Sequence, residues 1–204
     1  MSMLVYGDSR SGNCYKIQMV CAELSLDHDW QEIDVMSGVT RSPDFLAKNP
    51  NGRVPLLALY DGRYLPESNA IISYLADGSP LAGADRWGRA RVLQWMFFEQ
   101  YSHEPYIAVC RFIVKFLGNP PDRAASLAEK RVAGYRALGV MEGELAQRDY
   151  IAGDGYTLAD IALYAYTHVA HEGGFDLASY PAIRSWCSRI EARPKYVPMR
   201  DTVI

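Results

Sequence analysis

The sequence predicts an α/β domain followed by an all-α domain. In the first 78 residues, short apolar runs alternate with helical patterns in the order β-α-β-α-β-β-α. Turn-forming residues then gather in Asp77-Gly78-Ser79-Pro80, and beyond them only long helical patterns follow. The expected division is therefore an α/β domain over 1–78, a linker over 79–85 and a helical domain over 86–204.

The elements of the first part follow from local patterns. Residues 3–6 are apolar and end at Gly7, as in a buried strand, whereas the apolar spacing after Asn13 is helical. Asp61-Gly62 predicts a hairpin turn and thus an antiparallel pair, while the first crossover predicts a parallel one. These features give a small mixed sheet with helices on both faces. The expected elements are strands at 3–6, 30–35, 54–60 and 63–65 and helices at 13–24, 43–48 and from 68 onward.

The second part shows long helical patterns separated by turn residues. Gly118-Asn119-Pro120-Pro121 and Gly153-Asp154-Gly155 break the pattern, and Pro105 should kink the first helix. The expected helices cover 87–116, 122–148, 158–170 and 182–192.

Composition narrows the function classes. The 204 residues are 49% hydrophobic and 22% charged, an ordinary globular balance. The net charge of −3 leaves no basic excess for nucleic acid or a membrane surface. The longest stretch without Asp, Glu, Lys or Arg, Ile161 to His171, is too short to span a bilayer, and Asp8 comes too early for a signal peptide. We expect a cytoplasmic protein with neither nucleic-acid nor membrane partners.

Cysteine and histidine spacing predicts no metal site. The chain has four cysteines without a CxxC pair, so free thiols are expected. Its four histidines offer no converging ligand set. The residues are Cys14, Cys21, Cys110, Cys187, His28, His103, His168 and His171.

Asn51-Gly52-Arg53-Val54-Pro55-Leu56 places a proline beside a predicted strand. Proline cannot donate to a strand ladder, so Pro55 indicates either an edge strand or a cis Val54–Pro55 bond. The cis form would turn the Val54 backbone N–H and C=O away from the sheet. Such a backbone pair can bind a cysteine-containing peptide as an added strand would.

Two predicted helix starts carry polar residues suited to a ligand. Ser68 is a good N-cap, but the same helix start could seat a ligand carboxylate, with Glu67 beside it for an ammonium group. The segment Ser9 to Cys14 caps the first helix or stabilises a thiolate there. Stabilisation by about 2.7 kcal/mol would lower a thiol pKa by roughly two units.

These motifs, in this order and followed by an all-helical domain, resemble the glutathione transferases over essentially the whole chain. The resemblance implies a thioredoxin-like first domain, cis Pro55, and glutathione as a cosubstrate. Val54 would pair with the cysteinyl backbone, Glu67 and Ser68 would hold the γ-glutamyl end, and Arg53 would reach the glycyl end. It also implies a homodimer.

The same resemblance assigns a capping box to the core helix of the second domain. Thr157 would cap this helix, Asp160 would return the bond, and Tyr156 would pack on Ile161. This motif concerns folding rather than catalysis.

The residue that activates the thiol is left open by the resemblance. Ser11 lies where the serine and threonine branches place their hydroxyl and is favoured, with Asn13 assisting or substituting. Tyr6 lies where another branch places a tyrosine, and Cys14 would suit a mixed-disulfide mechanism.

The first long helix of the second part should line the acceptor site between the domains. His103, Tyr106 and Arg111 are its candidate substrate-binding residues. Arg111 either faces an anionic ligand or sits in a surface or dimer ion pair.

The expected function is a glutathione transferase, in which the thiolate attacks a small hydrophobic electrophile. One alternative is a glutathione-dependent disulfide oxidoreductase or peroxidase, favoured by the Ser11-Gly12-Asn13 spacing. The other is a non-catalytic interaction module of the same fold.

Overall fold

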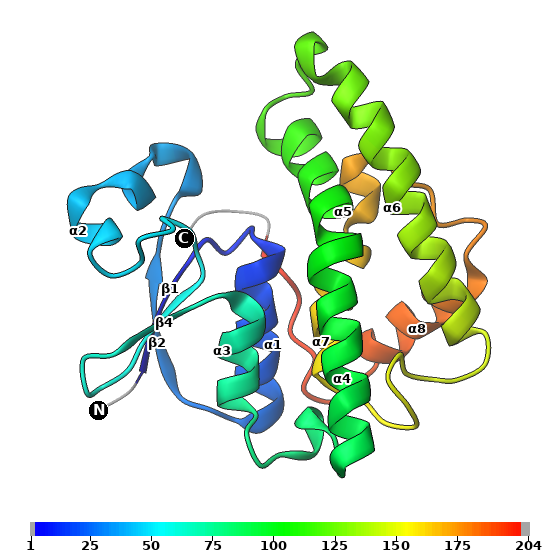
Figure 1. The fold of residues 1–204 in the computed structure, drawn as a ribbon, viewed down its shortest axis with the longest axis horizontal. Coiled ribbons are helices and arrows are strands. Elements are labelled where there is room, and N and C mark those ends of the chain that lie inside the picture. Colours follow the sequence, from blue (N-terminus) through cyan, green and yellow to red (C-terminus); the bar gives the residue numbers. More distant parts are fainter. Residues whose placement is uncertain (1–2, 201–204) are drawn as a thin grey trace. The chain divides into compact units, whose positions relative to one another are not determined.

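The computed structural model describes residues 3–200, which form two compact units. One unit comprises the chain up to Gly78 together with the segment that starts at Pro194, and the other runs from Ser79 to Arg193 (Figure 1). The predicted helical domain, 86–204, includes this C-terminal segment, and residues 201–204 of that prediction lie outside the described part. The segment packs on the first unit because Lys195 Nζ donates to Glu23 O at 2.8 Å and Tyr15 Oη donates to Val197 O at 2.6 Å.

The first unit contains a four-stranded mixed sheet in the order β2-β1-β3-β4. Strand β1 runs parallel to β2 and antiparallel to β3, which also pairs antiparallel with β4. The predicted order and the mixed sheet are confirmed. The strands are β1 (Met3–Gly7), β2 (His28–Glu32), β3 (Leu56–Ala58) and β4 (Tyr64–Pro66).

Two strands are shorter than predicted, for local reasons. Strand β2 ends before Asp34, because the Asp34 carboxylate caps a 3₁₀ turn, Val35–Ser37, by accepting from the Met36 amide at 3.0 Å. Strand β3 begins at Leu56, directly after Pro55, which lacks the amide hydrogen that a ladder requires.

Three helices cover the sheet, α1 (Gly12–Leu24), α2 (Pro43–Leu46) and α3 (Ser68–Leu75). Helices α1 and α3 pack beside each other on one face, and α2 lies on the other (Figure 1). Helix α1 presents Cys14, Ile17 and Val20 to the core, each with no exposed surface. The α1–α3 face therefore brings the two predicted ligand-binding helix starts into one layer.

The second unit is all-helical, as predicted. Its helices are α4 (Arg86–Phe98), α5 (Glu104–Arg111), α6 (Ala124–Leu145), α7 (Leu158–Thr167) and α8 (Pro181–Glu191). No helix among the described residues is long and apolar enough to cross a membrane.

The predicted helix over 87–116 is not uniformly α-helical. A π turn at Glu99–His103 joins α4 to α5, with the Glu104 amide donating to the Glu99 carbonyl five residues back. Pro105, which follows at once, has no amide hydrogen for the usual bond four residues back, and this is a common setting for a local change of helix type. A second π turn, Phe112–Phe116, follows α5.

The buried helix α7 starts with the predicted capping box. Thr157 and Asp160 form the reciprocal bonds, and the Thr157 amide donates to Asp160 Oδ2 at 2.9 Å. The other oxygen, Asp160 Oδ1, accepts from the Ile151 amide at 2.8 Å and from Trp186 Nε1 at 2.9 Å. Asp160 therefore ties together three segments of the helical unit.

Candidate active site in the first unit

Ser11 is the N-cap residue of α1, but its hydroxyl does not cap the helix. Its backbone is extended, with φ −83° and ψ 126°, and its side chain makes no capping hydrogen bond. The Ser11 amide donates to Asp8 O at 2.9 Å, and its carbonyl accepts from the Tyr15 amide at 2.9 Å. The backbone is thus held at both sides, while the half-buried hydroxyl lies at the positive end of the helix.

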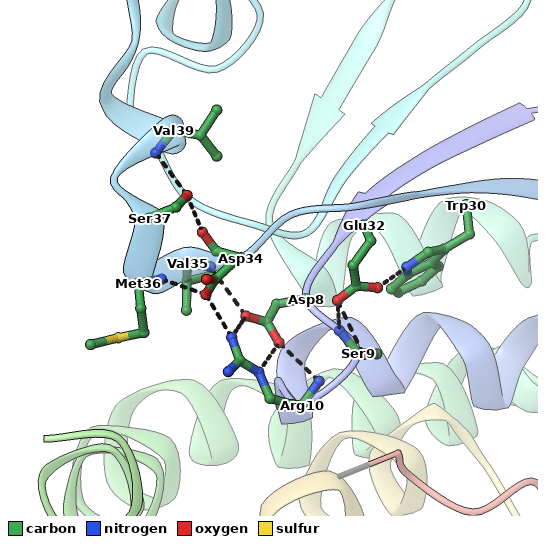
Figure 2. A network of polar contacts seen from close by, with 10 residues as sticks. All are labelled: Asp8, Ser9, Arg10, Trp30, Glu32, Asp34, Val35, Met36, Ser37 and Val39. Atoms are coloured by element: carbon green, nitrogen blue, oxygen red, sulfur yellow. Dashed lines mark hydrogen bonds and ion pairs between the residues drawn. The ribbon is translucent and has the colours of Figure 1, made fainter. Parts of the chain in front are cut away.

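A partly buried ion-pair network, which was not predicted from the sequence, holds the loop that leads to Ser11 (Figure 2). Arg10 donates from Nε and Nη2 to the two oxygens of Asp8, at 2.9 and 2.7 Å, and from Nη2 to Asp34 at 2.8 Å. Asp8 has no exposed surface and also accepts from the Val35 amide at 3.2 Å. The network therefore joins the ends of β1 and β2.

A second set of contacts fixes the neighbouring residue. Ser9 donates to Glu32 Oε1 from its amide at 2.8 Å and from its hydroxyl at 3.1 Å. Trp30 Nε1 donates to the other oxygen of the same carboxylate at 2.7 Å. The sequence did contain a signal for such an anchored loop. Asp8 is an acidic residue directly after the strand β1.

We expect Asp8→Asn to lower the free energy of unfolding by about 2 kcal/mol at neutral pH, because Arg10 loses the buried one of its two charged partners. Burial raises the pKa of Asp8, but hydrogen bonds from Arg10 and Val35 outweigh it and lower the pKa from its usual value. A carboxyl group whose pKa is lower in the folded than in the unfolded state stabilises the fold at pH values above its unfolded-state pKa. This contribution is lost as the pH falls through the folded-state pKa. In urea unfolding, the difference in free energy of unfolding between the wild type and Asp8→Asn should become smaller below about pH 4.

The matched control is Asp61→Asn. Asp61 has the same spacing to Arg63 and pairs with it at 2.6 Å, but on an exposed hairpin. Its replacement should change stability little at any pH. An Asp8→Asn effect no larger than that of the control would contradict the anchoring role.

Cys14 lies inside the unit and is not poised as a nucleophile. Burial raises the pKa of its thiol to about 12, although hydrogen bonds from the Ser11 side chain and the Asp8 backbone act in the opposite direction. At neutral pH it is therefore a neutral thiol with no exposed surface, which disfavours the mixed-disulfide mechanism.

We expect Cys14 to resist iodoacetamide in the folded protein at pH 7.5 and to react once the chain is unfolded in urea. Mass spectrometry of the peptide that contains it would measure both rates. Cys187 should behave in the same way, because burial also raises the pKa of its thiol to about 12. Labelling of Cys14 as fast as that of free cysteine would restore it as a candidate nucleophile.

Tyr6 packs on the α2 face of the sheet. Its ring meets Phe45 of α2 edge-on at 6.3 Å, and it joins a cluster of Ile33, Phe45 and Leu56. Helix α1 covers the opposite face, so this packing disfavours Tyr6 as the thiol-activating residue.

The Val54–Pro55 peptide bond is cis, which confirms that expectation. The edge-strand alternative is wrong, because β3 lies between β1 and β4. Within residues 3–200, neither the amide nor the carbonyl of Val54 forms a hydrogen bond. Asn49 Nδ2 holds the preceding carbonyl, that of Arg53, at 2.8 Å. A half-buried backbone pair is thus available to an added peptide strand.

At the start of α3 the capping assignment differs from the prediction. Glu67 is the N-cap residue, with φ 72° and ψ 112° and no side-chain cap, and Ser68 is the first residue of the helix. A non-glycine residue in this backbone region costs about 1–3 kcal/mol and often marks a functional site. Glu67 is exposed, whereas Ser68 is buried and its hydroxyl donates to Asn13 Oδ1 at 3.1 Å.

Two of the predicted substrate-binding residues are engaged inside the helical unit. His103 has no exposed surface, and its Nε2 lies 2.9 Å from Thr167 Oγ1. Arg111 is buried and donates to Glu172 at 2.5 Å, in an internal pair rather than a surface or dimer one. These contacts favour structural roles for both residues. Tyr106 is half-buried, with Lys130 Nζ 5.9 Å from its ring centre.

Comparison with known proteins identifies similar chains over nearly the full length. Residues 10–77 match the model of the glutathione S-transferase N-terminal domain, and residues 106–194 match that of the C-terminal domain. Glutathione S-transferase 3 of Zea mays is 33% identical over 94% of this chain and 90% of its own. The disulfide-bond oxidoreductase YfcG of Escherichia coli is 29% identical over 89% of this chain and 87% of its own.

A solved structure is more similar still. The crystal structure of a glutathione S-transferase from Pseudomonas fluorescens has a TM-score of 0.96 and 53% identity, covering 98% of this chain and all of its own. The likeness therefore extends over both units.

Proposed function

Because this chain belongs to the glutathione S-transferase family, we propose that it binds glutathione on its first unit and activates the thiol for attack on a small hydrophobic electrophile. The observation that carries the proposal is the Val54 backbone, whose amide and carbonyl form no hydrogen bond within the described residues. A cysteinyl residue paired there would satisfy both groups, as an added β-strand does.

The remaining roles are assigned by charge and position. The uncapped start of α3 offers backbone N–H groups to the γ-glutamyl carboxylate, with Ser68 in its first turn, and the exposed Glu67 faces the ammonium group. Arg53, also exposed, serves the glycyl carboxylate. Tyr106 remains the candidate for the acceptor substrate.

Ser11 donates a hydrogen bond to the glutathione sulfur at the positive end of α1. Its hydroxyl hydrogen rotates about the Cβ–Oγ bond, so it can turn from the Cys14 sulfur to a ligand sulfur. The thiol proton passes to solvent, and the thiolate forms a C–S bond with the electrophile. With an aryl halide, the halide leaves with the bonding electron pair.

A disulfide oxidoreductase is the second candidate, favoured by the similarity to YfcG and by the Ser11-Gly12-Asn13 spacing. In that reaction the bound thiolate attacks a disulfide, forms a mixed disulfide and releases a thiolate. A second glutathione then resolves the mixed disulfide and leaves oxidised glutathione.

We also propose a homodimer. Leu93, Phe97 and Tyr101 are spaced four residues apart along α4 and its π turn and are 46%, 70% and 84% exposed. Such a stripe on one helix face is typical of a surface that another chain covers. Light scattering on a size-exclusion column gives the mass, and 22.9 kDa would exclude the dimer.

Titration of the purified protein with glutathione, with thiolate absorbance followed against pH, tests the main proposal. A bound thiol pKa well below that of free glutathione is expected. Absence of binding at millimolar glutathione would refute the proposal. Turnover of an aryl halide compared with a glutathione-dependent disulfide substrate then separates the two reactions.

A further inference from the structure

Lys16 of α1 is a lysine with no exposed surface. Lysine is among the residues least often fully buried, because its ammonium group loses hydration unless other groups replace it. Lys16 lies three residues after Asn13, on the same face of the helix, and α1 packs against α3. The buried ammonium group therefore lies beside the start of α3.

The contacts of this ammonium group form a chain that includes Asn13. Lys16 Nζ donates to Ser68 Oγ at 3.3 Å and to Asn69 Oδ1 at 3.2 Å. Ser68 Oγ in turn donates to Asn13 Oδ1 at 3.1 Å. Three polar side chains from two helices thus connect the proposed carboxylate site to the proposed thiol site.

The direction of these hydrogen bonds follows from the chemistry of the groups. An ammonium group only donates, so Ser68 Oγ accepts from Lys16 and its single hydrogen remains for another acceptor. That hydrogen is directed to the carbonyl oxygen of Asn13. The carboxamide is thereby oriented with its N–H₂ group on the side away from Ser68.

We propose that Lys16 is a positioning residue that orients the Asn13 amide toward the glutathione sulfur through Ser68. The inference rests on the proposed function and adds a residue to it. Lys16 directs the Ser68 hydroxyl, the hydroxyl holds the amide oxygen, and the amide nitrogen donates to the thiolate. This relay, from Lys16 through Ser68 to Asn13, acts on the ionisation of the bound thiol and not on the affinity of the protein for glutathione.

Lys16→Met tests the relay because methionine fills a similar volume and cannot donate. At saturating glutathione, the pKa of the bound thiol should rise by about one unit, the loss expected for one hydrogen bond to a charged group. Asn13→Ala should give a rise of similar size. The double variant should show no more than Asn13→Ala alone, because both changes break one chain.

Binding of S-methylglutathione separates the relay from a direct effect on the ligand. This analogue keeps the carboxylates and lacks the thiol, so Lys16→Met should weaken its binding by less than about threefold. An unchanged bound-thiol pKa, additive effects in the double variant, or a tenfold loss of S-methylglutathione affinity would each overturn the relay.

Lys195→Met is the matched control, since Lys195 also donates to two oxygens of the first unit, Glu23 O and Ser25 Oγ. It should leave the thiol pKa unchanged. If Lys16→Met does not fold, Ser68→Ala breaks the chain at its middle and should raise the thiol pKa as Asn13→Ala does. Wild-type protein that binds no glutathione would instead refute the proposed function itself.

Discussion

Replacing Ser11 by alanine is expected to raise the pKa of the bound glutathione thiol by about two units, from ~6.5 to ~8.5, and to lower the conjugation rate about 25-fold at pH 7. The hydroxyl at the start of α1 makes no capping hydrogen bond, so its removal should cost little stability. Loss of about 2.7 kcal/mol of thiolate stabilisation corresponds to the two-unit shift. Thiolate absorbance against pH and kcat/KM for an aryl halide would measure the two effects.

Ser42→Ala provides a reciprocal control. Ser42 is also the N-cap of a helix in the first unit, but its hydroxyl caps α2 by accepting from the Phe45 amide at 3.3 Å. Its loss should lower stability by about 1 kcal/mol and leave the thiol pKa unchanged. If Ser11→Ala behaves in the same way, Ser11 is a structural cap and the thiolate assignment passes to Asn13.

Asp160→Asn is expected to destabilise the helical unit by about 3–4 kcal/mol. Both oxygens of Asp160 accept hydrogen bonds, from Ile151, Trp186 and Thr157. An asparagine would place an N–H₂ group against at least one of these donors and leave buried groups unsatisfied. Urea unfolding followed by tryptophan fluorescence, to which Trp87, Trp95 and Trp186 of this unit contribute, would measure the loss.

The control for this substitution is Asp149→Asn in the same unit. Asp149 is 72% exposed and pairs with Arg189 at 2.8 Å, so its neutralisation should cost no more than about 1 kcal/mol. Equal effects at the two positions would show that the Asp160 hydrogen bonds contribute little net stability.

Local signals in the chain were sufficient for much of the fold. The switch from mixed to helical patterns near residue 79, the Asp61-Gly62 hairpin and the Thr157–Asp160 capping box each depend on neighbours within a few positions. For the Val54–Pro55 bond the local sequence left two alternatives open, and the resemblance to the family selected the cis form that the structure contains.

Helical periodicity alone does not show what surrounds a polar residue. His103 and Arg111 lie on a helix expected to line a substrate site, but their partners Thr167 and Glu172 lie more than sixty residues away in the sequence. A repeat of 3.6 residues defines the faces of a helix without stating what covers each face.

The sequence by itself therefore determined the family, the order of the elements and the motifs that mark the glutathione site. Only the tertiary structure decided which polar and charged side chains meet, as in the Asp8–Arg10–Asp34 network and the Lys16–Ser68–Asn13 chain. The physical reason is that burial and hydrogen-bond partners of a charged side chain depend on distant segments. Those segments meet only when the sheet and its helices assemble.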